Sequence, residues 1–314
     1  MTQASALRRD AGLLAGDLPP LLAHAERLAA TVLPGDHGRR RAGQGDEFWQ
    51  YRPAHEGDEA RHIDWRRSAR SDAHFIRQKE WQAAQTVLFW VDDSRAMDFA
   101  SGRDLPSKGW RARLLALACA SLLLRGGERV GLLGGRLLPG AGERQLGPLV
   151  LALAREGGTN GASANGAGEK GAPARSVPGG RTSEYGVPAL GGLRANTRAV
   201  MISDFLGDPA ALERALSQAV DHGVEGVLLQ VLDPQEEAFP FDGRTIFESM
   251  GGTLRHETLK AGELRARYLD RLAARKAVLG DLARGAGWQY YCHHTDQPAS
   301  AALLWLYGAL ERKR

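Results

Sequence analysis

The apolar positions of this chain alternate between short continuous runs and longer stretches with helical spacing. Residues 86–91 read Thr-Val-Leu-Phe-Trp-Val, a run that predicts a strand buried on both faces. Residues 110–124 repeat apolar side chains at helical spacing and are followed by Gly126-Gly127, which predicts a helix that ends at glycine. The same patterns predict strands at residues 129–133, 199–203, 226–232 and 288–292, and helices at residues 147–155, 209–222, 259–282 and after residue 298.

Strands that alternate with helices imply a parallel sheet with helices on both of its faces. We therefore predict an α/β fold, a doubly wound and mostly parallel sheet. A helical pattern at residues 17–32 precedes it, whereas residues 34–70 have no periodicity, so we expect an extended, hydrogen-bonded segment of irregular structure there. Together these features predict an N-terminal extension, residues 1–80, packed on a main domain of residues 81–314.

A low-complexity insertion interrupts the main domain at about residues 157–192. Its composition shifts to Gly, Ala, Ser and Pro, and Val177 is the only large aliphatic side chain within residues 161–180. So few apolar contacts cannot offset the entropy lost on ordering the backbone. We therefore predict that residues 161–180 are disordered and dispensable for folding.

Composition and charge narrow the class of protein. The chain has 314 residues, of which 43% are hydrophobic and 25% charged, which indicates a soluble protein with a substantial core. Its net charge is +4, but residues 35–80 carry ten Lys and Arg against nine Asp and Glu, a mixed surface that argues against a nucleic-acid partner. Its two cysteines, Cys119 and Cys292, are too few for a disulfide framework or a four-cysteine zinc site. No apolar stretch approaches the roughly 20 residues of a membrane span, so we expect a cytoplasmic protein.

Two of the predicted strands end in an acid and a hydroxyl. Asp92 and Ser94 follow the strand at residues 86–91, and Asp204 follows the strand at residues 199–203, which ends in a serine. Ligands of open parallel sheets bind outside the carboxyl ends of the strands, and such oxygen atoms suit magnesium or manganese. We predict that the two strands are neighbours, so that the carboxylates of Asp92 and Asp204 face one shared crevice. We favour Asp92 over Asp93 because successive side chains of a strand point to opposite faces. The alternative is that these residues only cap the helices that follow.

These residues resemble a known family. Asp92-x-Ser94-x-Ala96-Met97 is similar to the Asp-x-Ser-x-Ser-Met signature that opens the metal-ion-dependent adhesion site of von Willebrand factor A-like domains. An upstream hallmark resembles that of the bacterial group called domain of unknown function 58. It reads Tyr51-Arg52-Pro53, Gly57-Asp58, Arg61-x-Ile63-Asp64-Trp65 and Ser68-Ala69-Arg70.

The resemblance implies a Rossmann-like fold and a degenerate metal site. The family's site takes an aspartate, two serines, a threonine from a later loop and a strand-end aspartate. The matching residues here are Asp92, Ser94, Thr159 and Asp204, while Ala96 stands at the second serine position. Because alanine removes a ligand oxygen, we expect magnesium to bind weakly or not at all.

The resemblance also implies a noncatalytic interaction protein. Its members are often encoded beside MoxR-type AAA+ ATPases, which implies such an ATPase as partner in the maturation or assembly of a client protein. The alternative is a magnesium-dependent phosphohydrolase or phosphotransfer domain with a strand-end aspartate as nucleophile. That chemistry normally needs a second acid two residues later, where this chain has Ser94, and no suitably placed lysine is evident. We therefore expect no enzymatic activity.

Two further groups of residues have two interpretations each. The charged residues around Trp65 either form a binding surface or clamp an irregular segment through ion pairs, and we favour the clamp. They are Arg61, Asp64, Arg66, Arg67 and Arg70. His293 and His294 invite a zinc interpretation, but adjacent histidines are poorly placed to chelate one ion, so we favour an ordinary turn at the end of a strand.

Overall fold

The computed structural model groups the chain into two units by its internal contacts, residues 1–35 with 86–314 and residues 36–85. The predicted division at residue 80 stays a prediction. The structure describes residues 18–32, 39–43, 47–55, 58–60, 63–70, 73–102, 104–156, 183–188, 190–191, 193–195, 197–252 and 254–311. The segment predicted to be disordered, residues 161–180, lies outside this part of the chain.

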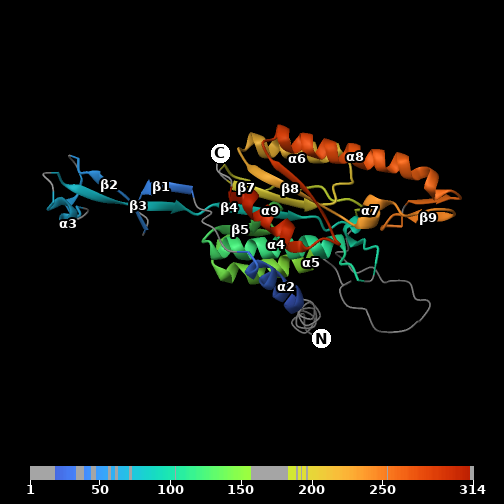
Figure 1. Cartoon of the computed structure of the whole chain (residues 1–314), viewed down its shortest axis with the longest axis horizontal. Coiled ribbons are helices and arrows are strands. Elements are labelled where there is room, and N and C mark those ends of the chain that lie inside the picture. The colour runs from blue at the N-terminus through green and yellow to red at the C-terminus, as the bar shows by residue number, and fades with distance from the viewer. Residues whose placement is uncertain are drawn as a thin grey trace, which may run out of the picture. The chain divides into compact units, whose positions relative to one another are not determined.

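The larger unit is built on a six-stranded sheet of strand order β11-β8-β7-β4-β5-β6 (Figure 1). All neighbouring strands are parallel except β5 and β6. The predicted mostly parallel sheet is therefore confirmed. The strands are β4 Thr86–Val91, β5 Arg129–Leu132, β6 Leu137–Ala141, β7 Thr197–Ser203, β8 Glu225–Leu232 and β11 Gln289–His294.

The edge strand β6 was not predicted from the sequence. It reads Leu-Leu-Pro-Gly-Ala, and proline and glycine both argue against a strand. Because β6 lies at the edge and pairs only with β5, its Pro139 does not have to donate a hydrogen bond to a second neighbour.

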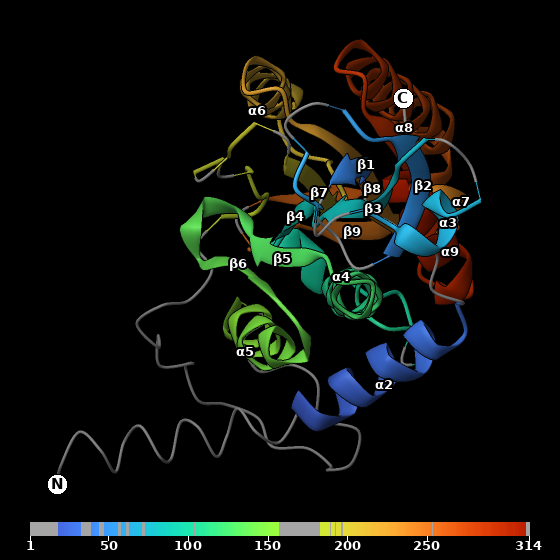
Figure 2. The same ribbon diagram turned by 90° about the vertical axis from the view of Figure 1, so that its left-hand side faces the viewer.

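Helices lie on both faces of the sheet (Figure 2). Alternating side chains of the central strands divide the core into two layers, one on each face. Val87 and Phe89 of β4 pack against helices on one face, while Leu88 packs on the other. The first layer contains helices α2 Leu18–Ala30, α4 Lys108–Arg125, α5 Leu146–Glu156 and α9 Ala299–Glu311, and the second α6 Pro209–Asp221 and α8 Ala261–Gly285. The chain therefore forms the predicted mixed α/β fold with helices on both faces.

Helix α4 lies in the middle of the first layer and is buried along most of its length. It begins where the Ser107 hydroxyl accepts a hydrogen bond from Trp110 N at 3.2 Å. It ends at Gly126, followed by Gly127 with φ of 81°, a conformation that favours glycine. Two cations of this helix, Lys108 and Arg111, are buried with it and make the polar contacts described below.

The described residues of the unit 36–85 form a three-stranded antiparallel sheet. The strands are β1 Arg39–Gly43, β2 Glu47–Pro53 and β3 Phe75–Ala83, in the order β1-β3-β2. The prediction of an extended, hydrogen-bonded segment over residues 34–70 is therefore confirmed for β1 and β2, but its irregular character was wrong there. The outer strands β1 and β2 both pair with β3. Because β3 lies outside residues 34–70, the sequence of that segment alone does not reveal the pairing.

One of the charged residues around Trp65, Asp64, makes hydrogen bonds that hold this unit together, and the predicted clamp of ion pairs stays a prediction. Asp64 caps the short helix α3 Trp65–Ser68 by accepting from Arg67 N at 3.1 Å, and it also accepts from the Tyr51 hydroxyl at 3.1 Å. The Arg67 guanidinium lies 4.4 Å from the centre of the Tyr51 ring. Arg61 lies outside the described residues. The hydrogen bonds of Asp64 support the structural interpretation of this residue.

A short helix and a hairpin follow the sheet strand β8. They are α7 Pro234–Ala238, β9 Thr245–Glu248 and β10 Arg255–Thr258. Within the described chain, β9 and β10 pair only with each other and form a short antiparallel hairpin. In the part of the chain that the structure describes, no helix has both the length and the apolar character to cross a membrane.

Candidate functional site

The two strand-end aspartates lie at one edge of the sheet, as predicted, because β4 and β7 are parallel neighbours. Asp92 follows β4 and its main-chain N–H donates to Ile202 O of β7 at 2.9 Å. Its carboxylate accepts from Ser94 N at 2.8 Å and from the Ser203 hydroxyl at 2.7 Å. The Asp92 side chain is 1% exposed, so it lies inside the protein rather than in an open crevice.

Asp204, at the end of β7, holds a buried cation that was not predicted. The Lys108 ammonium lies 2.8 Å from Asp204 Oδ2 and 2.6 Å from Glu236 Oε1 of α7. The other oxygen, Asp204 Oδ1, accepts from Leu206 N at 3.0 Å. Lys108 and Asp204 are each 1% exposed. One ammonium therefore compensates two carboxylates inside the protein.

Residues 183–188 cover the Asp92 side of this edge. Their carbonyls accept from the main chain that follows Asp92, Ser183 O from Arg95 N at 3.2 Å and Glu184 O from Ala96 N at 3.0 Å. Gly186 packs directly on the carboxylate, since a Cβ there would lie 2.2 Å from Asp92 Oδ1. This close approach requires glycine and closes the site from this side.

The donor set of the described residues does not fit a magnesium ion. Magnesium requires near-octahedral oxygen coordination at about 2.0–2.1 Å. Both oxygens of Asp92 and both of Asp204 already have protein partners, and Ala96 offers none. The Ser94 hydroxyl is buried and meets no hydrogen-bond partner, while Thr159 lies outside the described residues. These partners leave too few oxygens for an ion, and no chemical step is derived through a metal here.

Burial shifts the pKa values of Asp92, Glu236 and Lys108. Burial raises the pKa of Asp92, partly opposed by its hydrogen bonds with Ser203 and Ser94. Burial also raises the pKa of Glu236, and the Lys108 ammonium opposes that rise. For Lys108, burial favours the neutral amine, but the charges of Asp204 and Glu236 outweigh it and raise the pKa of the ammonium. The lysine is therefore charged in the folded protein at every physiological pH.

Sequence reasoning missed Lys108 and Glu236. Lys108 is one of only six lysines and lies just before the helix predicted from residue 110, where it looks like an exposed charge. The available signal, a single lysine at the start of a mostly apolar helix, is weak because the same helix also carries arginines. Its partners lie 96 and 128 residues away in the sequence, and no local pattern predicts them.

The second buried cation of α4, Arg111, fixes the chain that follows β11. It donates to Thr295 O at 2.8 Å, Gln297 O at 2.7 Å and His293 Nε2 at 3.0 Å. The neighbouring His294 instead contacts Glu237 Oε2 at 2.7 Å. The two histidines thus have different partners, and they do not form one chelating pair.

We expect His293 to make the protein sensitive to acid. Burial and the Arg111 charge lower the pKa of His293 from 6.5 to about 4. Between these values the unfolded chain binds a proton that the folded chain does not, so stability falls as the pH drops from about 6.5 to about 4. The loss amounts to up to about 3 kcal/mol at roughly 1.4 kcal/mol per pH unit.

Urea unfolding at a series of pH values measures this effect. The control is His293→Gln, which keeps an acceptor for Arg111 but does not titrate. The wild type should lose more stability than the variant over this range. Equal losses in both proteins would show that His293 does not contribute.

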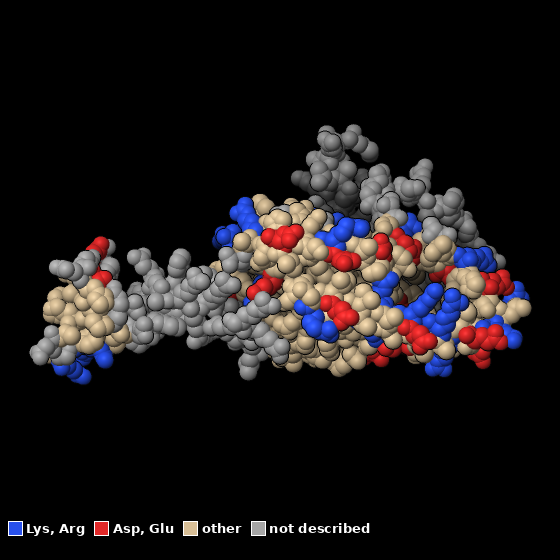
Figure 3. All heavy atoms as spheres, turned by 90° about the horizontal axis from the view of Figure 1, so that it is seen from above, with Lys and Arg blue, Asp and Glu red and all other residues tan. Residues whose placement is uncertain are grey.

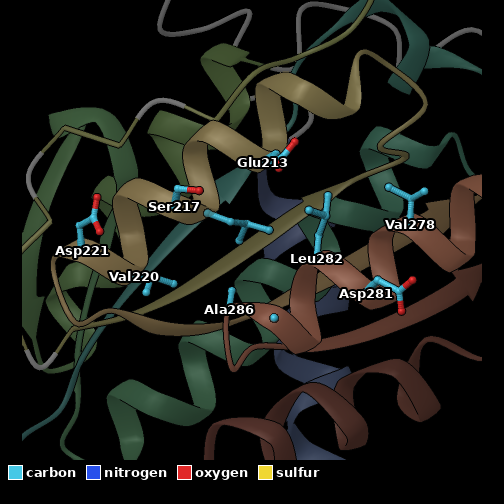
Figure 4. A pocket seen from close by; sticks show the side chains of 10 residues that line it. Glu213, Ser217, Val220, Asp221, Val278, Asp281, Leu282 and Ala286 are labelled. Atoms are coloured by element: carbon cyan, nitrogen blue, oxygen red, sulfur yellow. The ribbon is translucent and has the colours of Figure 1, made fainter.

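A separate hollow of about 510 Å³ lies between α6 and α8 (Figure 4). Glu213, Asp221 and Asp281 line it and are exposed, beside apolar residues such as Val220 and Leu282. It contains none of the predicted site residues, and no buried polar side chain lines it. The strand ends therefore remain the candidate site.

Comparisons with known proteins place the chain among proteins without an assigned activity. The family model described as "Protein of unknown function DUF58" matches residues 50–278. Uncharacterized proteins Mb1516 of Mycobacterium bovis and Rv1480 of Mycobacterium tuberculosis are each 26% identical, over 94% of this chain and 92% of theirs. The conserved hypothetical protein BatB of Bacteroides thetaiotaomicron has a crystal structure that matches 72% of this chain and 98% of its own, at 12% identity and a TM-score of 0.37.

Proposed function

This chain belongs to the family described as protein of unknown function DUF58, and we propose that it is a noncatalytic protein-interaction domain. In this proposal the sheet is a von Willebrand factor A-like domain whose metal site is degenerate. Its partner is a MoxR-type AAA+ ATPase, with which it acts in the maturation or assembly of a client protein.

The observation that carries this proposal is the internal neutralisation of the strand-end carboxylates. A nucleophilic or metal-binding aspartate has to reach its ligand, but Asp92 and Asp204 are each 1% exposed. Their oxygens are held by Ser94, Ser203, Leu206 and Lys108. These carboxylates therefore stabilise the fold beneath a binding surface, and neither of them is available to react with a substrate.

The surface around this edge suits a protein partner. Tyr185 and Val187, on the segment that covers Asp92, are 39% and 59% exposed. The Glu184 carboxylate joins this segment to the β9–β10 loop by accepting from Gly251 N at 2.7 Å. That loop exposes Met250 by 44% of its surface. Exposed apolar side chains on adjoining segments are typical of protein-binding surfaces.

The charges of the larger unit support a protein partner more than a nucleic acid. On the face seen in Figure 3, acidic and basic side chains of the described residues interleave. A phosphate backbone requires a continuous basic stripe, which this face lacks.

One observation bears on the alternative, a phosphohydrolase or phosphotransfer domain. A lysine does lie at the neighbouring strand end, because Lys108 Nζ is 2.8 Å from Asp204 Oδ2. This lysine is nevertheless engaged by the buried Asp204 and the partly buried Glu236, and Asp92 is covered by Gly186. Release of phosphate from p-nitrophenyl phosphate with magnesium, lost in Asp92→Asn, would favour the alternative.

We expect the complex with the ATPase to survive removal of divalent metal. The physical reason is that the Lys108 ammonium, a covalent part of the chain, compensates the strand-end charge in place of a soluble ion. Co-purification of tagged wild-type chain with a MoxR-type ATPase from the same organism, with and without EDTA, measures this. Nucleotide-free ATPase is used, so that EDTA does not act through its magnesium. Dissociation by EDTA, reversed by magnesium, would contradict the proposal.

A further inference from the structure

Three metal-ligating side chains converge near the carboxyl ends of β8 and β11, on the β11 side of the strand-end aspartates. Cys292 and His294 are two residues apart on β11, so both side chains point to the same face. Glu237 reaches them from α7, which directly follows the neighbouring strand β8. One ligand atom from each of the three residues lies within 4.8 Å of the other two.

The spacing of these atoms is close to what one small ion needs. Zinc binds nitrogen and carboxylate oxygen at about 2.0–2.2 Å and sulfur at about 2.3 Å, so two of its ligands lie at most about twice that distance apart. His294 Nε2 already lies 2.7 Å from Glu237 Oε2. Small rotamer changes of the cysteine and the glutamate would bring all three atoms onto a common centre.

The chemistry of the donors selects the metal. An imidazole, a thiolate and a carboxylate are the ligands of zinc and similar transition metals, whereas magnesium and calcium prefer oxygen alone. Three protein ligands leave a fourth position for water or another ligand. The Glu237 side chain is 44% exposed and that of His294 is 19% exposed, so an ion has access from solvent.

In this structure the positive charge at the cluster comes from Lys276. Lys276 of α8 forms an ion pair with Glu237 Oε2, the same oxygen that contacts His294. Its side chain is 23% exposed and has a flexible stem, so it can leave toward solvent. A metal ion and the Lys276 ammonium would therefore compete for the same carboxylate.

We propose that Glu237, Cys292 and His294 form a binding site for a zinc-type divalent ion, with one coordination position open and Lys276 as the competing internal cation. The site does not depend on the proposed partner function, since none of its residues belongs to the exposed surface of Tyr185 and Val187. The alternative is a purely structural cluster in which Lys276 and His294 tie α7, α8 and β11 together.

Cobalt(II) titration of the full-length protein tests the proposal, because a cobalt–thiolate bond gives a charge-transfer band in the near ultraviolet. We expect a band that saturates at one cobalt per chain and is displaced by zinc. Cys292→Ser should abolish it, and His294→Ala should weaken binding at least about tenfold. Cys119→Ala is the matched control, because Cys119 is buried in the core and the band should remain.

Lys276→Met separates a metal site from a structural cluster. Removal of the competing charge should tighten cobalt and zinc binding by about tenfold, measured by the same titration and by calorimetry with zinc alone. Circular dichroism checks that each variant is folded. No thiolate band in either the wild type or a folded Lys276→Met protein would overturn the proposal, as would a band that persists in Cys292→Ser.

Discussion

Replacement of Lys108 by methionine is expected to lower the free energy of unfolding by about 3–5 kcal/mol, the typical cost of removing one partner of a buried ion pair. Methionine fills a similar volume but leaves Asp204 and Glu236 without their cation. Both carboxylates lie beside a side chain that is 1% exposed, so water does not replace the lost charge. Urea unfolding of the two proteins at neutral pH measures the difference.

Two further variants make this result specific. Lys260→Met removes a lysine whose side chain is 73% exposed and pairs with Glu263, and it should change stability by less than about 0.5 kcal/mol. Asp204→Asn in the Lys108→Met background should restore part of the loss, because it removes an uncompensated charge. A loss below about 1 kcal/mol in Lys108→Met would show that the buried cluster does not hold the strand ends.

Replacement of Val187 by aspartate is expected to weaken the complex with the ATPase by at least about tenfold while leaving the fold intact. Val187 is 59% exposed on the segment over Asp92, so a charge there meets water in the free protein. In a complex the same charge would be buried without a partner, which is costly. The dissociation constant measures the effect, and an unchanged melting temperature shows that the variant is folded.

The core of the sheet could be predicted from the sequence because its strands are buried on both faces. A parallel strand such as β4 is a continuous apolar run, and the helices between such runs set their order in the chain. The same reasoning placed Asp92 and Asp204 together, since neighbouring parallel strands end at the same edge. The antiparallel sheet of residues 36–85 was not predicted. Its strands carry many charged residues, and β1 and β2 pair with β3, which comes later in the sequence.

The contacts that close the site could not be predicted, because they join residues far apart in sequence. Lys108 meets Glu236 across 128 positions, and Cys292 meets Glu237 only through the pairing of β11 with β8. Neither contact leaves a periodic or local signal. The sequence therefore indicated which carboxylates lie at the strand ends, and the tertiary structure was needed to find the cations that neutralise them.

The central claim is that the partner binds the surface that covers the strand ends. The most direct test is to compare the dissociation constant of the ATPase complex for the wild type and for two matched valine variants. Val187→Asp alters the surface over Asp92, whereas Val220→Asp places the same charge on α6, at a valine that is 46% exposed. We predict that Val187→Asp weakens binding at least about tenfold and that Val220→Asp binds like the wild type. Equal affinity of all three folded proteins, or no complex with the wild type, would contradict it.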